Sequence, residues 1–159
     1  MMKYLIFIIA LSIFFGCKNH EKQNTLKETN TPSTITDNSE DFEVYKNSWI
    51  NEIKTNNTEK WLANNETNEG VENMINSLNT IKTNTLEDYK ILAKELNLNK
   101  NYIIKNCTMT GEPHENLHVW LLPLMAKIEA LSEAKTIKEA AKLKQSTAEN
   151  INKYNTYFK

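Results

Sequence analysis

The chain has 159 residues, with 19 basic and 20 acidic side chains and a formal net charge of −1 at pH 7. Every basic residue is a lysine. Proteins that read nucleic acids or bind phosphates as their main task normally use the bidentate fork of arginine. The composition therefore argues against both classes and against a nucleic-acid partner. About 120 residues remain after the N-terminal segments described next, enough to bury one core.

The first sixteen residues predict a bacterial lipoprotein signal peptide. A basic head at Lys3 precedes an apolar run from Tyr4 to Phe15, which is too short to span a bilayer. A small residue then stands directly before Cys17, as in the lipobox, whose cysteine becomes the lipid-modified first residue of the mature protein. Cys17 is the expected lipidation site, and the membrane is the expected partner. An ordinary cleaved signal peptide or an uncleaved anchor is the alternative.

The residues after Cys17 predict a tether and a location. Residues 17–37 are polar and lack hydrophobic periodicity, so they read as a flexible spacer in front of a domain over residues 38–159. Lys18, at the second mature position, favours the outer membrane by analogy with lipoprotein sorting. We expect a cell-envelope protein whose domain faces either the periplasm or the exterior.

The domain itself predicts an all-α fold. Its only glycines are Gly70 and Gly111, its only prolines are Pro113 and Pro123, and no stretch alternates as a strand would. Apolar residues recur instead at intervals of three and four. Short connections make sequential helices antiparallel neighbours, so an up-and-down bundle of four to five helices is expected.

Three of these helices are expected in the first part of the domain. The first should start near Ser39 and bury one apolar stripe. This stripe comprises Phe42, Tyr45, Trp49 and Ile53 and continues to Trp61 and Leu62. The second covers residues 71–81. The third begins at Leu86 and either continues to Cys107 or breaks at the polar residues 97–101.

Two more helices follow. One begins at Glu112-Pro113, because proline is tolerated in the first helical turn, and extends to about Leu131. The last covers residues 135–157 and carries an alanine-rich apolar stripe. The five residues between Cys107 and Pro113 are expected to reverse the chain.

That reversal carries the most informative stretch of the sequence, C-T-M-T-G-E-P-H-E-N-L-H at residues 107–118. Thiolate, thioether and imidazole form a ligand set for a soft or borderline metal, and Cys107, Met109, His114 and His118 supply it. The two histidines are four residues apart, a spacing that points both imidazoles the same way from a helix. The sequence predicts a site for Cu(I) or Zn(II), with copper slightly favoured because a cysteine and a methionine are both present.

Two further observations support this metal site. Lipidation of Cys17 would leave Cys107 without an intramolecular disulfide partner, a liability outside the cytoplasm unless the thiol is buried or engaged. Helical phase also brings Cys107 and both histidines toward the same end of the bundle. A shared metal requires the Cys107 sulfur and both imidazoles to lie within about 4 Å of each other.

Two alternatives remain for the same residues. They can simply lock the loop between two helices, in a structural or interaction lipoprotein without metal. His114-Glu115-Asn116-Leu117-His118 also matches H-E-x-x-H, in which two histidines bind zinc and the glutamate activates water. No histidine follows His118, and the domain is small and helical, so a zincin-like hydrolase is disfavoured and no enzymatic activity is expected.

The run C-T-M-T-G-E-P-H-E-N-L-H-V-W-L-L-P resembles a motif of small secreted or lipid-anchored helical proteins of Bacteroidota, approximately C-x-M-x-G-x-x-H-x-x-L-H-x-(aromatic)-L-x-P. The earlier stretch W-L-A-N-N-E-T-N-E-G-V is similar to a second motif of the same proteins. The resemblance spans about residues 49–131. It implies an anchored helical domain in which Cys107, Met109, His114 and His118 belong to one unit, and it implies no particular activity.

Overall fold

The computed structural model describes residues 43–159, which belong to a compact unit formed by residues 36–159. This described part contains one short 3-10 helix and four α-helices: η1 (Ser48–Asn51), α2 (Asn65–Thr80), α3 (Leu86–Asn106), α4 (Gly111–Glu133) and α5 (Ile137–Tyr157). The predicted signal peptide, the lipidation site Cys17 and the tether lie outside the described residues.

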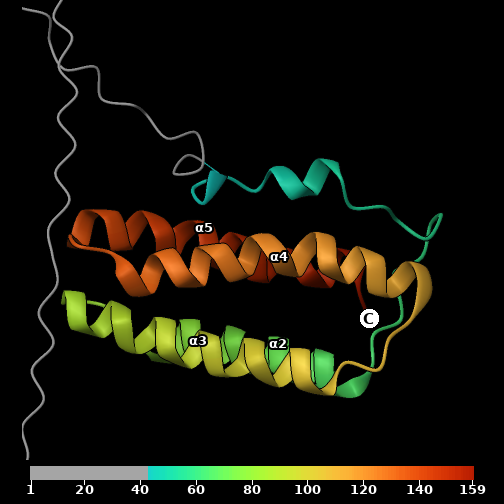
Figure 1. Ribbon diagram of the computed structural model, residues 1–159, viewed down its shortest axis with the longest axis horizontal. Coiled ribbons are helices and arrows are strands. Elements are labelled where there is room, and N and C mark those ends of the chain that lie inside the picture. Colours follow the sequence, from blue (N-terminus) through green and yellow to red (C-terminus); the bar gives the residue numbers. More distant parts are fainter. Residues whose placement is uncertain (1–42) are drawn as a thin grey trace, which may run out of the picture. The chain divides into compact units, whose positions relative to one another are not determined.

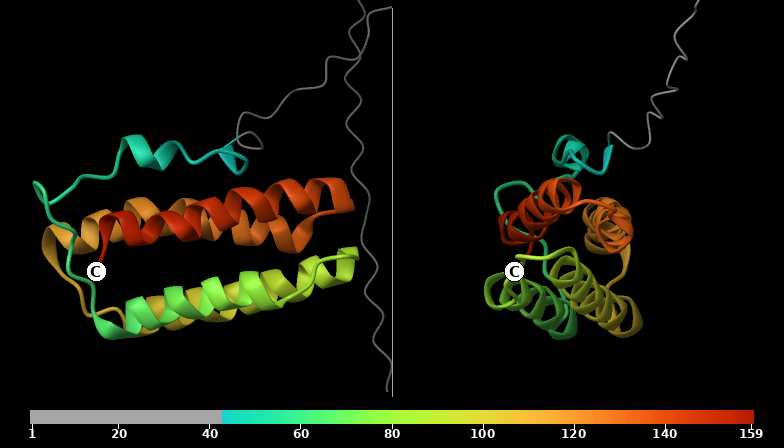
Figure 2. Two further views of the ribbon diagram at one scale, coloured as in Figure 1. Left: turned by 180° about the vertical axis from the view of Figure 1, so that it is seen from behind. Right: turned by 90° about the vertical axis from the view of Figure 1, so that its left-hand side faces the viewer.

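The four α-helices form an up-and-down bundle. Each packs against the next in the chain, and α2 also packs against α5, which closes the ring of contacts (Figure 1). The end-on view in Figure 2 shows the four helices side by side, with the segment before α2 outside them. The predicted all-α bundle is confirmed. No helix within residues 43–159 combines the length and apolar character that a membrane crossing requires.

α3 and α5 begin at side-chain caps, whereas α2 and α4 have none, and α2 begins at Asn65, six residues before the predicted start at residue 71. The Thr85 hydroxyl accepts a hydrogen bond from the Asp88 amide at 3.2 Å, and the Asp88 carboxylate accepts one from the Thr85 amide at 2.8 Å. This capping box satisfies amide donors that the first turn of α3 leaves free. At the start of α5, Thr136 accepts from the Glu139 amide in the same way.

α3 continues through the polar residues 97–101 without a break. Leu96 and Ile103, on either side of this stretch, are fully buried. The Asn99 side chain donates to the Glu95 carbonyl at 3.0 Å, one turn back, so it follows the helix and does not compete with it. Of the two expectations for this helix, the continuous one is correct.

The predicted first helix is wrong. Residues 43–64, here called the strap, contain only η1 and turns and lie along the outside of the bundle (Figures 1 and 2). Trp49 and Ile53 are buried, as expected of the predicted stripe, whereas Tyr45 is 40% and Leu62 70% exposed. The apolar residues of the strap contact the bundle from one short 3-10 turn and irregular backbone, so their α-helical spacing is coincidental.

The end of the strap pairs with the C-terminus. The Trp61 amide donates to the Tyr157 carbonyl at 2.8 Å, and the Lys159 amide donates to the Trp61 carbonyl at 2.9 Å. Asn57 adopts a left-handed conformation with φ 55°, in the turn just before this pairing. Asparagine tolerates that conformation better than most residues, so the Asn-rich stretch favours a turn over a helix.

Aromatic residues fill the core at the α4–α5 contact. The Trp120 and Tyr154 rings meet edge to face at 4.9 Å, and Phe158 stacks on Tyr154 at 4.8 Å. The Trp120 indole N–H donates to the Asn150 carbonyl at 3.0 Å, and the Asn150 amide returns a bond of 3.3 Å to the Trp120 carbonyl. This exchange between two buried residues fixes the register of α4 against α5.

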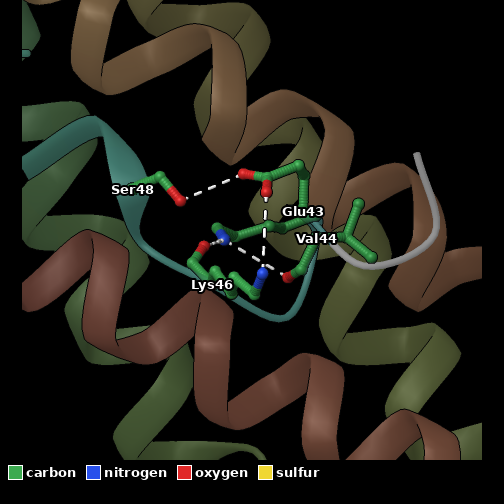
Figure 3. A network of polar contacts seen from close by, with 5 residues as sticks. Glu43, Val44, Lys46 and Ser48 are labelled. Carbon is green, nitrogen blue, oxygen red and sulfur yellow. Dashed lines mark hydrogen bonds and ion pairs between the residues drawn. The ribbon is translucent and has the colours of Figure 1, made fainter. Parts of the chain in front are cut away.

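A fully buried lysine holds the strap to the bundle. The Lys127 ammonium, on α4, donates to the Val44 carbonyl at 3.2 Å, to the Lys46 carbonyl and to the Ser146 hydroxyl at 2.9 Å. We call this group the lysine cradle. Its three acceptors match the three hydrogens of an ammonium. On the strap side, Glu43 accepts from the Ser48 hydroxyl at 3.0 Å (Figure 3).

Burial of the Lys127 ammonium costs desolvation energy. Burial lowers the pKa of Lys127 to about 8, although the carboxylates of Glu149 and Glu43 act in the opposite direction. Three direct hydrogen bonds offset part of the desolvation of the ammonium. The result is a cation held mainly by backbone carbonyls, at a position where no sequence pattern indicates a buried charge.

Candidate functional site

The predicted metal ligands lie at the junction of α3 and α4. Cys107 follows the last residue of α3, and its amide still donates to the Ile103 carbonyl at 2.9 Å. Gly111 opens α4 with φ 64°, a left-handed conformation that glycine adopts without strain. Nothing lies within 4 Å of a Cβ built at Gly111, so backbone conformation alone explains the glycine. This tight reversal brings α4 back beside Cys107.

The reversal places the thiol of Cys107 against the first histidine. The Cys107 Sγ lies 3.6 Å from the His114 Nδ1, a hydrogen-bonding distance for sulfur. The His114 and His118 rings are neighbours, with centroids 4.3 Å apart and planes tilted by 55°. Cys107 and His114 are half-buried, and His118 is exposed. His114 therefore contacts both the Cys107 thiol and the His118 ring.

The four predicted ligands do not converge on one point. Among residues 43–159, no group of three or more histidine, cysteine, aspartate or glutamate side chains is arranged so that it could hold a metal ion. Met109 is half-buried and packs against the hydrophobic core. We call Cys107, Met109, His114 and His118 the junction site. Within it, Cys107 and His114 form a thiol–imidazole pair, and His118 and Met109 lie nearby.

Asn64 supports the junction site from the start of α2. Its side-chain amide donates to the Asn106 carbonyl at 3.0 Å, directly before Cys107, and to the Glu66 carboxylate at 2.7 Å. The Asn64 side-chain oxygen accepts from the Thr67 hydroxyl at 2.6 Å. The carbonyls of the last helical turn have no intrahelical donor, so Asn64 satisfies one of them and joins α2 to the end of α3.

Tyr154 forms a second support behind Cys107. Burial raises the pKa of Tyr154, and the nearby charge of a Cys107 thiolate adds to the effect. The protonated hydroxyl donates to the Asn68 side-chain oxygen at 2.8 Å. Gly70 lets α2 approach closely, because a Cβ there would lie 2.4 Å from the Ile103 side chain. α2, α3 and α5 are thus tightly packed behind the thiol.

Asn116 connects the junction site to the strap. It is buried on α4, between the two histidines in sequence, and its side-chain oxygen accepts from the Lys54 amide at 2.8 Å. The same side chain donates to the Glu112 carbonyl at 2.9 Å. The Trp61 indole N–H then donates to the Lys54 carbonyl at 2.8 Å. The strap is therefore held to α4 at Asn116 as well as at the lysine cradle.

The geometry gives no support to the hydrolase alternative. Glu115 is exposed, as is His118. Glu129, the first carboxylate after His118, lies eleven residues further along the same helix. At a rise of 1.5 Å per residue, that separation is about 16 Å along the axis, too far for a shared metal.

Several residues of this site were not anticipated as functional. Asn64, Asn68 and Gly70 belong to the earlier W-L-A-N-N-E-T-N-E-G stretch, so the resemblance of that stretch to a known motif was a usable signal. In the structure the earlier stretch supports the end of α3, next to the stretch that carries Cys107. For Asn116 and Tyr154 the sequence offered no comparable signal.

Comparison with known proteins adds no relative. No protein-family model matches the chain, and no match was found among curated proteins or solved structures. Arguments about function therefore rest on the residues and their geometry.

Proposed function

We propose that this protein is a lipid-anchored cell-envelope protein that binds, buffers or hands over a transition metal at the junction site, with Cu(I) slightly ahead of Zn(II). The observation that carries the proposal is the 3.6 Å separation of the Cys107 Sγ and the His114 Nδ1. His118 and Met109 are the candidates for completing the coordination.

The separation of the two atoms suits a shared metal. With a metal–sulfur bond of about 2.3 Å and a metal–nitrogen bond of about 2.0 Å, two ligand atoms lie about 3.5 Å apart in a tetrahedral site and about 3.7 Å apart in a trigonal one. The observed distance falls between these values. Cys107 and His114 can therefore bind one ion with little movement of the backbone.

The surroundings suit a site that loads and unloads. Cys107 is the free cysteine of the described part and is half-buried, so it is shielded yet reachable. His118 is exposed and its ring lies beside the His114 ring, so it would move to reach a metal held by Cys107 and His114. Ligands that must move bind less tightly than preformed ones, which favours exchange over permanent storage.

The proposal is tested by metal titration of residues 20–159, which retain the whole compact unit. Cu(I) and Zn(II) affinities are measured for this protein and for the Cys107→Ser and His114→Ala/His118→Ala variants. We expect both variants to lose at least tenfold in Cu(I) affinity. The matched control is His20→Ala, which removes a histidine of the predicted tether and should leave the affinity unchanged.

Two outcomes would contradict the proposal. Equal and weak affinities in all four proteins would remove the metal site. If His114→Ala/His118→Ala binds metal as the unchanged protein does but unfolds at a lower temperature, the structural alternative is supported. That alternative is favoured by the packing of Cys107 and Met109 against the core.

A further inference from the structure

A groove between α3 and α4 lies apart from the junction site. It has a volume of about 430 Å³ and lies between the middle of α3 and the second half of α4. Its apolar part comprises Ala93 and Ile128, which are buried, and Met125, which is half-buried. Small-molecule sites of proteins begin at about 300 Å³, so the groove can take a small ligand.

Lysines dominate the charge of this groove. Lys90, Lys94 and Lys100 line it from α3, and Glu129 is the acidic residue in its lining. None of the three lysines forms a hydrogen bond or an ion pair with another residue of the described part. Three ammonium groups against one carboxylate leave the groove with an excess of two positive charges at neutral pH.

These three lysines differ from Lys127 of the lysine cradle. Lys127 has three protein acceptors and is fully buried. Lys90 and Lys94 are exposed and Lys100 is half-buried, and all three keep their hydrogen-bonding capacity free beside an apolar floor. A positive rim over an apolar floor is complementary to a molecule with a negative head and a hydrocarbon tail.

We infer that the α3–α4 groove binds a single-chain anionic amphiphile, with the head on Lys90, Lys94 and Lys100 and the tail on Met125 and Ile128. Methionine adapts its side chain to irregular apolar ligands, which suits a flexible chain. A carboxylate and a phosphate head share the same charge recognition by lysine. This inference does not depend on the metal proposal.

Isothermal titration of residues 20–159 tests the inference with four probes. Dodecanoate and dodecyl phosphate carry the expected head and tail and distinguish the two anionic heads. Dodecyltrimethylammonium has the same tail with a positive head, and acetate has the negative head without the tail. We expect binding of at least one of the first two and none of the last two at the same concentration.

Variants that remove single charges sharpen this test. Lys94→Gln should weaken binding about two- to fivefold, as expected for one exposed ion pair, and Glu129→Gln should strengthen it by a similar factor. Lys105→Gln, on an exposed part of α3 outside the groove, is the matched control and should change nothing. Met125→Gln should weaken binding through the tail, with the fold checked by circular dichroism.

The results decide the inference in either direction. Binding of the cationic probe as tightly as the anionic ones would reduce the groove to a nonspecific apolar surface and overturn it. Equal effects of Lys94→Gln and Lys105→Gln would do the same, since they would indicate general attraction to a lysine-rich protein. Opposite shifts from Lys94→Gln and Glu129→Gln would support it.

Discussion

The lysine cradle and the junction site both involve polar groups where chain segments meet α4, yet they are built in opposite ways. In the cradle, Lys127 is fully buried, and three acceptors use all its hydrogens. At the junction site, Cys107 and His114 are half-buried, His118 is exposed, and the thiol contacts one imidazole. The cradle is complete without a ligand, whereas the junction site has donor atoms to spare.

Burial and hydrogen-bond satisfaction distinguish structural from functional polar groups in this molecule. A buried polar group that is fully hydrogen-bonded stabilises one arrangement of the chain, and a ligand could only disrupt it. A metal site needs accessible ligand atoms whose softness matches that of the metal, and neighbouring residues that hold these ligands in place. Substitutions in the lysine cradle should change stability, whereas substitutions around the junction site should change metal affinity.

The largest effect is expected from Lys127→Ala. The substitution removes a buried side chain and leaves two strap carbonyls without a donor, so the free energy of unfolding should fall by about 3 kcal/mol. Chemical denaturation measures the change. Lys127→Met keeps most of the volume and should cost less. Lys142→Met, at an exposed site on α5, is the control and should be neutral. A neutral Lys127→Ala would show that the cradle does not hold the strap.

The cradle should also make stability depend on pH. Folding lowers the pKa of Lys127 from 10.5 to about 8. Between these values the unfolded chain keeps a proton that the folded protein has released, so stability should rise with pH. Below pH 8 both states are protonated and this contribution becomes constant. The measurement is the difference in unfolding free energy between the protein and Lys127→Met from pH 7 to 9.5. Parallel curves would contradict it.

A smaller effect on stability, with a clear effect on the metal, is expected from Asn64→Asp. The variant keeps the shape but loses the donor to the Asn106 carbonyl and places a second carboxylate beside Glu66, which should cost about 2 kcal/mol. Metal affinity should fall about tenfold, as for other second-layer residues. Asn79→Asp, exposed at the end of α2, is the control. If Asn64→Asp lowers stability without changing affinity, the second layer serves the fold alone.

The smallest effect is expected from Glu115→Gln. Glu115 is exposed on α4, so neither stability nor metal affinity should change measurably. The variant is compared with the protein in a metal titration and in a peptide-cleavage assay with zinc present. Cleavage that requires Glu115 would revive the hydrolase alternative and would make the junction site catalytic.

Most of the helices were predictable because their signals are local. Thr85 with Asp88 and Thr136 with Glu139 cap helices through contacts three residues apart, and such pairs can be recognised in sequence. The strap was not predictable in this way. Trp49 and Ile53 have helical spacing, but the backbone of Trp61 pairs with the C-terminus, a contact that no local pattern reveals.

The site was predictable in its chemistry and only partly in its geometry. The residue types and the spacing of His114 and His118 indicated a ligand set, and a short turn indicated that Cys107 would lie nearby. Whether three ligands converge depends on rotamers and on the angle at which α4 leaves Gly111, and these are outcomes of packing. Asn64 and Asn116 act across 42 and 62 residues of sequence, so their roles appear only in three dimensions.

The sequence alone determined the helical class, the approximate starts of α3, α4 and α5, and the thiol, thioether and imidazole groups near one turn, because each depends on residues within a few positions of one another. Tertiary structure decided the rest. It buried Lys127 against carbonyls more than 80 residues away, laid the strap outside the bundle and brought the Cys107 sulfur to 3.6 Å from His114. Burial and metal-ligand distances depend on which segments meet, and only the packed core sets those meetings.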